Sequence, residues 1–397
     1  MGSEMCIRDR VGVALTVLTS LGQIDLTPLM PVLLQPSPAA VTALAERLRT
    51  AKRPLLWLGG GARGAGAAVE RFLKMGWGVV TSVQGRGVIP EDHPANLGSY
   101  NLQKPAEDLY ATCDAMLVVG SRLRSNETLR YKLKLPKNLY RIDANALAHN
   151  RGYNSDYFVQ GDALTTLHAL ADKLEGHMQV DPQLVKDVKG AHTQAAGLVD
   201  ATLGAYVTLK NELAAQAGMP LWWVRDITLS NSMWGNRAPL LDNPRAGVHA
   251  LGGGIGQGLA MAIGVAVADA EHALGRKTVA LVGDGGFMLN VGELACAVQE
   301  KANLVVLLMN DSRYGVIRNI QDDIYGGRHC YVDLHTPNFG QFCSSLQVTH
   351  FLLNDPQETR HVLAQAFAAK GPVVVEVDMN AWGPFSAKFA GPILKKD

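Results

Sequence analysis

Two aspartates in this sequence are placed where a metal-binding pair is expected. Asp284 lies in the run Val282-Gly283-Asp284-Gly285-Gly286, and Asp311 follows Leu308-Met309-Asn310. Each comes directly after an apolar stretch typical of a buried parallel strand. The interval between them has room for one crossover helix, expected over 291–301, so the two strands should be neighbours. Because ligands bind at the carboxyl ends of such strands, the pair predicts a Mg²⁺ site built from carboxylate oxygens.

Glycines surround the first aspartate and crowd a second segment upstream. Gly283, Gly285 and Gly286 would let the backbone approach a phosphate closely and direct amides at it. The segment 247–268 contains no Asp, Glu, Lys or Arg, and five glycines lie between Gly252 and Gly258. Its length would suffice to cross a bilayer, but the crowded glycines indicate a loop that enters a buried helix.

A third polar segment follows an expected strand at 222–224. It runs from Asp226 to Trp234 and contains Ser230 and Asn231. These are ordinary turn residues, so the segment on its own is a weak signal.

Together these segments resemble the thiamine diphosphate signature of the acetolactate synthase, benzoylformate decarboxylase and pyruvate decarboxylase family. That signature is GDG, a helix, and then paired asparagines after a strand. The resemblance implies thiamine diphosphate bound through Mg²⁺, with Asp284, Asp311 and the main-chain carbonyl of Arg313 as metal ligands. Asp311 stands where the family has its second asparagine, which adds a negative charge beside the diphosphate. Tyr314 and Gly315 are expected to line the cofactor as well.

The same resemblance gives roles to the glycine-rich segment and to the third polar segment. Ile255 matches the bulky apolar residue that wedges between the two cofactor rings, and Gly253 matches the carbonyl that accepts from the exocyclic amine. We expect these two residues to make the catalytic contribution of the chain, with Gly254 between them in the cofactor site. Ser230 and Asn231 are expected to donate to phosphate oxygens, as Gly283, Gly285 and Gly286 do through their amides.

Family enzymes carry a further N-terminal domain whose glutamate activates the cofactor, and the sequence leaves no room for it. We therefore expect an N-terminally truncated member that is inactive on its own. Activity would mean that a carboxylate within these residues, with Glu293 as the nearest candidate, has taken over that role. The expected organisation is a foreign segment at 1–10, a domain remnant and linker at 11–38, a central α/β domain at 39–178 and a diphosphate- and Mg-binding domain at 190–385.

Apolar strands that alternate with helices must position these residues. The fold class expected is α/β, with two doubly wound parallel-sheet domains, the first Rossmann-like and the second binding the diphosphate. A polar connection at 176–188 is the expected boundary. The expected strands are 54–58, 78–82, 115–120, 139–143, 222–224, 278–282, 304–309 and 372–377, and the main expected helices are 41–48, 67–75, 163–174 and 195–217.

Composition excludes several classes of protein. Hydrophobic residues make up 47% and charged residues 18%, which is unlike a disordered or coiled-coil chain. Lys and Arg total 37 against 36 Asp and Glu, so no basic field supports nucleic-acid binding. The five cysteines form no CxxC pair, which argues against a zinc site or a redox dithiol and favours reduced thiols in the cytoplasm.

Three functions remain open at this level. The favoured one is a decarboxylase of a 2-oxo acid, with or without carboligation, that works as a homodimer or homotetramer without nucleic acid or membrane partners. The glycines at 59–61 could instead bind the diphosphate of FAD or NAD in an oxidoreductase, although the third fingerprint glycine is missing and Leu123 and Arg124 depart from the aspartate-rich run of FAD-binding members. A non-catalytic cofactor-binding fragment is the third. His249, His329 and His335 are candidates near the site, read as ordinary histidines.

Overall fold

The computed structural model describes residues 32–216 and 220–389. The chain forms two compact units, each built from separate stretches of sequence. The central unit comprises Leu33–Gly204 and Asn236–Gly247, and the C-terminal unit comprises Ala205–Gly235 and Val248–Ala390. The expected foreign segment at 1–10, and residues 11–31 of the expected remnant and linker, lie outside the described residues.

The central unit is built on a five-stranded sheet with the order β2-β1-β3-β4-β5, whose neighbouring strands pair in parallel. Its strands are β1 (Pro54–Leu58), β2 (Gly78–Thr81), β3 (Ala115–Val119), β4 (Asn138–Asp143) and β5 (Tyr157–Gln160). Its α-helices are α2 (Pro38–Leu48), α3 (Gly66–Lys74), α4 (Lys104–Ala111), α5 (Ala163–Leu174) and α6 (Leu184–Ala201), with short 3-10 turns η1 (Gly60–Ala62), η2 (Val83–Gly85), η3 (Ser125–Glu127) and η4 (Ala146–Ala148).

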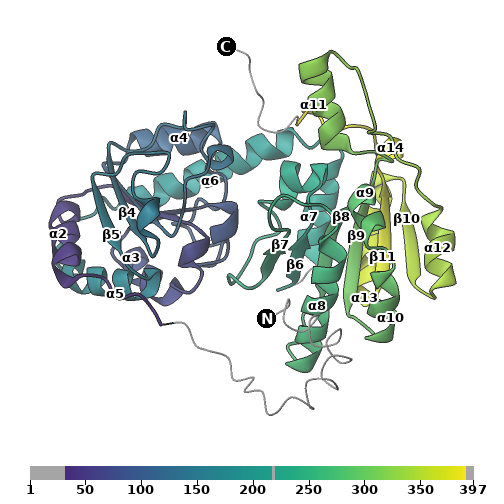
Figure 1. Cartoon of the computed structure of the whole chain (residues 1–397), viewed down its shortest axis with the longest axis horizontal. Helices are drawn as coiled ribbons and strands as arrows, with labels where there is room; N and C mark the ends of the chain where they lie inside the picture. The colour runs from purple at the N-terminus through teal and green to yellow at the C-terminus, as the bar shows by residue number, and fades with distance from the viewer. Residues whose placement is uncertain (1–31, 217–219, 390–397) are drawn as a thin grey trace, which may run out of the picture. The chain divides into compact units, whose positions relative to one another are not determined.

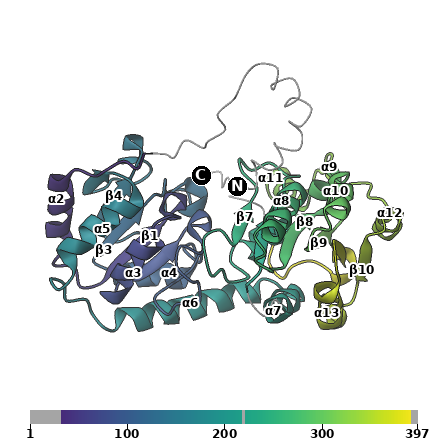
Figure 2. The same ribbon diagram turned by 90° about the horizontal axis from the view of Figure 1, so that it is seen from below.

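Both faces of this sheet are buried, which explains the continuous apolar strands. All five residues of β1 are buried, and alternate ones serve opposite layers. Leu56 and Leu58 pack with residues of α2, α3 and α5, whereas Leu55 and Trp57 pack with residues of α4 and α6. Helices accordingly cover the sheet on both sides (Figures 1 and 2).

The C-terminal unit repeats this plan with a six-stranded sheet of order β10-β11-β9-β8-β6-β7. Its strands are β6 (Trp222–Arg225), β7 (Gly247–His249), β8 (Thr278–Gly283), β9 (Leu304–Asn310), β10 (Thr349–Leu353) and β11 (Val373–Asp378). Its helices are α7 (Tyr206–Gln216), α8 (Gly258–Glu271), α9 (Asp284–Leu289), α10 (Glu293–Gln299), α11 (Gly315–Tyr325), α12 (Phe339–Ser345), α13 (Thr359–Ala368) and α14 (Met379–Trp382), with a π-helical turn η5 (Asn231–Gly235) and a 3-10 turn η6 (Pro356–Glu358).

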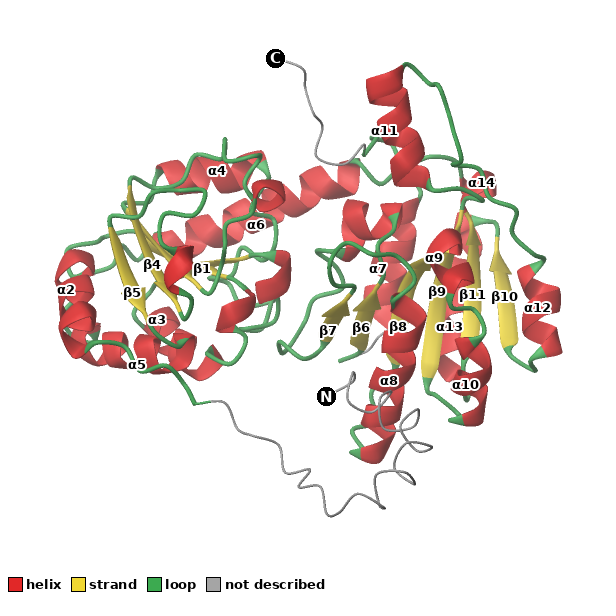
Figure 3. Ribbon diagram, in the orientation of Figure 1, coloured by secondary structure: helices red, strands yellow, loops and turns green. Residues whose placement is uncertain are grey.

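The expected α/β class with two parallel sheets is confirmed, and β8 and β9 are neighbours as the spacing of the two aspartates required. Figure 3 shows these two strands side by side, with α9 beyond the carboxyl end of β8. The glycine-crowded segment is a loop that leads into α8, as predicted. No helix among the described residues is both long enough and apolar enough to cross a membrane.

The structure differs from the polar connection expected at 176–188 and from the single helix expected at 195–217. Helix α6 already begins at Leu184, and residues 202–205 separate it from α7. Leu184, Val188 and Ala191 lie on one face of α6 and pack into the core of the central unit, so this helix belongs to that unit. Lys186 and Lys189 are exposed on the solvent-facing side of α6, as in other amphipathic helices.

Candidate functional site

The two aspartates predicted to share a metal meet at the ends of β8 and β9. Register pairs Gly283 with Met309, so Asp284 and Asp311 lie just beyond the same edge of the sheet. Asp284 is the first residue of α9 and is 1% exposed. Its Oδ2 atom is buried and has no hydrogen-bond partner among the described residues. A buried carboxylate oxygen without a hydrogen-bond partner is energetically costly. A cation bound at Asp284 would offset that cost.

The electrostatics of the corner support the same conclusion. Burial raises the pKa of Asp284 above its usual value, and the negative charge of Asp311 raises it further. Burial also raises the pKa of Asp311, an effect that the charge and the backbone N–H of Arg313 partly offset. A neighbouring negative charge disfavours ionisation of a buried carboxyl group such as that of Asp284. A divalent cation between the two aspartates would reverse this, because it stabilises both charged forms.

The third expected ligand, the carbonyl of Arg313, is oriented by a short antiparallel contact. Tyr314 N donates to Val332 O and Leu334 N donates to Ser312 O, each at 2.8 Å. These bonds flank Arg313, which faces Asp333 as a non-hydrogen-bonded pair, so its own N–H and carbonyl point away from that segment. The described residues contain no group of three His, Cys, Asp or Glu side chains suited to a metal. A metal site at this corner would therefore need the main-chain carbonyl of Arg313 as a neutral third ligand.

The first phosphate segment contributes two further buried polar atoms. Ser230 is 0% exposed, and neither its Oγ nor Oδ1 of Asn231 has a hydrogen-bond partner among the described residues. Asn231 opens η5, whose Trp234 packs against Trp223 of β6 with ring centroids 5.7 Å apart. Two unpartnered polar side chains on a firmly packed turn indicate a ligand that would complete their hydrogen bonds.

The glycine loop, which we define as residues 251–258, is held from within by one side chain. Gln257 Oε1 accepts from Leu251 N at 3.1 Å, and its Nε2 donates to Leu251 O at 2.9 Å and to Gly254 O at 3.0 Å. Gly253 has φ +78°, a left-handed conformation that disfavours other residues, and a side chain there would meet nothing within 4 Å. The loop thus presents Gly253, Gly254 and half-buried Ile255 in a defined shape.

The glycines next to the metal corner are required by the protein's own packing. A Cβ at Gly285 would lie 2.6 Å from Cε1 of Tyr314, and one at Gly286 would lie 2.9 Å from Oδ2 of Asp226. A Cβ at Gly315 would lie 2.6 Å from Oδ2 of Asp311, and one at Gly283 would lie 3.0 Å from a Thr228 hydroxyl. These glycines bring α9, α11 and the strand ends together, so they shape the site whether or not their amides reach a phosphate.

Comparison with known families agrees with this geometry. Residues 230–377 match the thiamine pyrophosphate enzyme C-terminal TPP binding domain, and residues 41–170 match the thiamine pyrophosphate enzyme central domain. The chain belongs to the thiamine pyrophosphate enzymes. The residues that formed the predicted signature all lie inside the first of these two matches.

Several named thiamine pyrophosphate enzymes are similar to this chain. A probable 2-ketoarginine decarboxylase of Pseudomonas aeruginosa is 34% identical over 301 residues, which cover 73% of this chain and 51% of the relative. The pyruvate oxidase of Lactiplantibacillus plantarum is 26% identical, covering 91% and 60%, and a probable acetolactate synthase large subunit of Methanococcus aeolicus is 24% identical, covering 85% and 60%. The chain thus spans about half to three fifths of the length of these relatives.

The fold has a counterpart among solved structures. A structure described as that of a thiamin diphosphate-dependent enzyme from Mycobacterium smegmatis superposes with a TM-score of 0.66 at 20% identity, covering 88% of this chain and 66% of that one. At this identity the likeness supports the fold of the thiamine pyrophosphate enzymes and carries no information on substrate.

The residues present fit the cofactor of the thiamine pyrophosphate enzymes. Asp284, Asp311 and the Arg313 carbonyl offer the hard oxygen donors that Mg²⁺ prefers. The Ser230 hydroxyl can donate to a phosphate oxygen, which would satisfy a buried group that is otherwise without a partner among the described residues. The Asn231 amide can also donate through its NH₂ group, although its unpartnered Oδ1 would need a donor. The observation that decides the fit is that Ser230 Oγ and Asp284 Oδ2 are both buried without a hydrogen-bond partner among the described residues, in segments that the family signature links.

The glycines at 59–61 serve packing in the central unit. Gly59 N donates to Val119 O at 2.9 Å and Gly61 N donates to Gly120 O at 3.0 Å, so these two amides are already used. A Cβ at Gly59 would overlap Gly120 O, and one at Gly61 would lie 2.8 Å from Gly120 Cα. Close contact between two loops therefore explains these glycines without a nucleotide.

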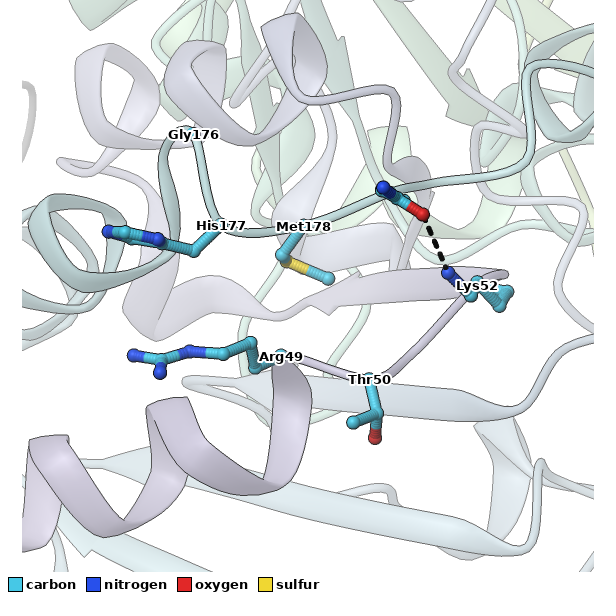
Figure 4. A pocket seen from close by; sticks show the side chains of 7 residues that line it. Arg49, Thr50, Lys52, Gly176, His177 and Met178 are labelled. Carbon is cyan, nitrogen blue, oxygen red and sulfur yellow. Dashed lines mark hydrogen bonds between the residues drawn. The ribbon is translucent and has the colours of Figure 1, made fainter.

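A hollow in the central unit shares no residue with the candidate site. It has a volume of about 320 Å³ and is lined by Arg49, Thr50, Lys52, Gly176, His177, Met178 and Gln179 (Figure 4). All of these except Met178 are exposed. Lys52 Nζ donates to Gln179 Oε1 at 3.4 Å, and solvated surface side chains account for the hollow.

The remaining candidates have ordinary partners, and two acidic residues were missed. His249 Nδ1 lies 2.7 Å from Ala250 O, His329 Nε2 lies 2.5 Å from Asp322 Oδ1, and His335 is exposed. Glu293 opens α10. The structure adds Asp226, at the end of β6, and Glu376 of β11, which accepts from Asn310 Nδ2 at 2.7 Å. Asp226 might have been noticed, since an aspartate directly after a buried strand repeats the pattern of Asp284.

Proposed function

We propose that this protein takes part in thiamine diphosphate- and Mg²⁺-dependent decarboxylation of a 2-oxo acid, with or without transfer of the product to a second carbonyl compound. The observation that carries the proposal is the metal corner. Buried Asp284 and half-buried Asp311 lie at neighbouring strand ends, and Asp284 Oδ2 has no partner among the described residues. Membership of the thiamine pyrophosphate enzymes supplies the class of reaction.

The bound cofactor would supply a carbanion for addition to the 2-oxo acid carbonyl and a sink for the electrons released with CO₂. In our proposal Asp284, Asp311 and the Arg313 carbonyl hold the metal, while Ser230 and Asn231 donate to the diphosphate. The glycine loop would orient the bound cofactor. Ile255 would support the bent form of the cofactor, and the Gly253 carbonyl would accept a hydrogen bond from its exocyclic amine, which would keep the reacting groups in reach.

The substrate proposed is a 2-oxo acid, and the first compound to try is 2-ketoarginine. A probable 2-ketoarginine decarboxylase is 34% identical to this chain, whereas the acetolactate synthase and pyruvate oxidase relatives are 24–26% identical.

We also propose self-association in a dimer or tetramer. Its support is a set of exposed apolar side chains in the C-terminal unit. They lie on the glycine loop, at the end of α9 and on α11, with Leu251, Leu289 and Ile317 being 70%, 57% and 48% exposed. Sedimentation velocity would measure the assembly.

Cofactor binding can be tested with one variant and a matched control. Thiamine diphosphate with Mg²⁺ should raise the melting temperature of the parent through binding linkage, and EDTA should remove the effect. Asp284→Ala should lose this stabilisation because a charged metal ligand is gone. Asp355→Ala, which removes an aspartate that caps η6 in the same unit, should keep it. Affinity of Asp284→Ala within about threefold of the parent, about 0.7 kcal/mol, would contradict the metal assignment.

The reaction is tested by following CO₂ release from 2-ketoarginine, pyruvate and benzoylformate in the presence of the cofactor and Mg²⁺. A yellow protein that absorbs at about 450 nm would favour the flavin alternative instead. Cofactor binding without release of CO₂ from any 2-oxo acid would favour a non-catalytic fragment.

A further inference from the structure

Asp226 is a buried carboxylate to which the proposed chemistry gives no task. It follows β6 directly and is 1% exposed. Its Oδ1 accepts from Ile227 N at 2.7 Å, and its Oδ2 accepts from Gly256 N at 2.8 Å and from Gly258 N at 3.2 Å. One side chain thus satisfies three backbone donors, two of which belong to the glycine loop.

The same carboxylate also contacts the helix that carries Asp284. A Cβ at Gly286 would lie only 2.9 Å from Asp226 Oδ2, so α9 approaches the carboxylate from the other side. The glycine loop is joined to α9 a second time, since Asn290 Nδ2 donates to Gly256 O at 2.6 Å. Asp226 therefore lies between the segment with Ile255 and the segment with the metal ligand.

From these contacts we infer that Asp226 is a positioning residue that fixes the glycine loop against α9. The inference rests on the proposed function, because the loop matters through the place it gives to Ile255 and Gly253. Asp226 does not touch the reacting groups in this account. It acts through Gly256 and Gly258, the residues that follow Ile255 and lead into α8.

Chemistry explains why an aspartate is needed at this position. An ionised carboxylate has only acceptor oxygens, and here both of them face backbone N–H donors. An asparagine would have to turn its NH₂ group toward one set of these donors. Gly258 is also the first residue of the 14-residue helix α8, whose N-terminus favours a negative charge. Burial raises the pKa of Asp226, while the backbone donors around it oppose that shift.

The chain offers a matched control at the other end of α8. Asp269 is 5% exposed, and its Oδ1 accepts from Trp222 Nε1 at 2.7 Å and from Arg276 N at 3.0 Å. Asp269→Asn therefore disturbs a comparable buried carboxylate in the same unit without contact to the glycine loop. Any general loss of stability should appear in both variants.

The experiment is hydrogen exchange of the cofactor-free chain, followed by mass spectrometry of the peptide covering residues 250–259. Asp226→Asn should accelerate exchange in this peptide about tenfold, which corresponds to about 1.4 kcal/mol, whereas Asp269→Asn should leave it at the parent rate. If Asp226→Asn does not fold, Asp226→Glu keeps the charge but displaces the oxygens by one methylene, and the same acceleration is expected. Parent-like exchange in a folded Asp226 variant would overturn the inference.

Binding gives a second readout that separates positioning from general damage. With Mg²⁺, Asp226→Asn should bind thiamine diphosphate about tenfold more weakly, about 1.4 kcal/mol, yet bind inorganic pyrophosphate as the parent does. Equal weakening for both ligands would overturn the inference, because it would mean that the whole unit is disturbed. A parent that binds neither ligand would refute the proposed function, and the exchange experiment would still decide the role of Asp226.

Discussion

Asp311 is the residue at which this chain departs from the family signature, and its surroundings show the cost. Half-buried Asp311 places a second carboxylate beside Asp284, and its negative charge raises the pKa of Asp284. Arg313 offsets part of this, since its side chain Nε donates to Asp311 O at 2.7 Å and its charge lowers the pKa of the carboxyl. Asp311 thus brings a stronger metal ligand together with a less favourable local charge.

The first prediction concerns this departure. Asp311→Asn should bind thiamine diphosphate and Mg²⁺ at neutral pH as well as the parent or better, because one negative charge next to the diphosphate is removed. Titration calorimetry with both variants measures the difference, and Asp355→Asn serves as a control for loss of charge elsewhere in the unit. A loss of more than about tenfold in affinity would show that the carboxylate itself is required, as for a different metal.

At the scale of elements, β9, β10 and β11 are joined by a short chain of polar side chains. Asn310 Nδ2 donates to Glu376 Oε1 at 2.7 Å, and His350 Nε2 lies 2.8 Å from Glu376 Oε2. Asn310 Oδ1 in turn accepts from Ser312 N at 3.1 Å. Glu376 therefore braces the turn that carries Asp311.

The second prediction tests this brace. Glu376→Ala should lower the free energy of unfolding by about 1–3 kcal/mol, because it leaves the half-buried amide of Asn310 and the ring of His350 without their acceptor. Urea unfolding of the C-terminal unit provides the measurement. The control is Glu358→Ala in η6, where a surface change should stay within about 0.5 kcal/mol. An unchanged midpoint for Glu376→Ala would show that the contact contributes nothing to stability.

The secondary-structure elements also show how much of the fold can be predicted from the sequence. Strands buried on both faces, such as β1 and β9, have continuous apolar runs and were predicted closely. The edge strands β5, β7 and β10 were not predicted, since most of their residues are only partly buried and the apolar run is broken. The metal corner was predictable because both aspartates directly follow central strands. The contacts of Asp226 with Gly256 and Gly258 were not, because they depend on how a distant loop folds back.

At the scale of the whole molecule, the central unit contains a second stretch of sequence that is separated from its first stretch along the chain. Residues 236–247 fall inside the match to the C-terminal domain but pack with Leu33–Gly204. Their anchor is the ion pair of Arg86 and Glu91, both 2% exposed, at 2.6 Å. Arg86 donates to Pro239 O at 2.5 Å, and Glu91 accepts from Leu241 N at 2.9 Å.

The third prediction concerns this anchor. Glu91→Ala should destabilise the central unit by about 3–5 kcal/mol, because the guanidinium of Arg86 would remain buried without its counterion. Thermal or urea unfolding measures the loss. Asp108→Ala, which breaks the exposed Lys104–Asp108 pair on α4, should cost no more than about 1 kcal/mol. Equal effects of the two substitutions would mean that the buried pair is not an anchor.

The return of residues 236–247 to the central unit also has a consequence for synthesis. Domains usually fold as they leave the ribosome, at about 5–20 residues per second. The central unit cannot be completed when Gly204 emerges, because Leu241 and its neighbours have not yet been made. The last residues of the central unit, up to Gly247, follow Gly204 by about 2–9 s at those rates. During that interval Arg86 and Glu91 lack their backbone partners, so the nascent chain should depend on chaperones at this stage more than a domain of contiguous sequence would.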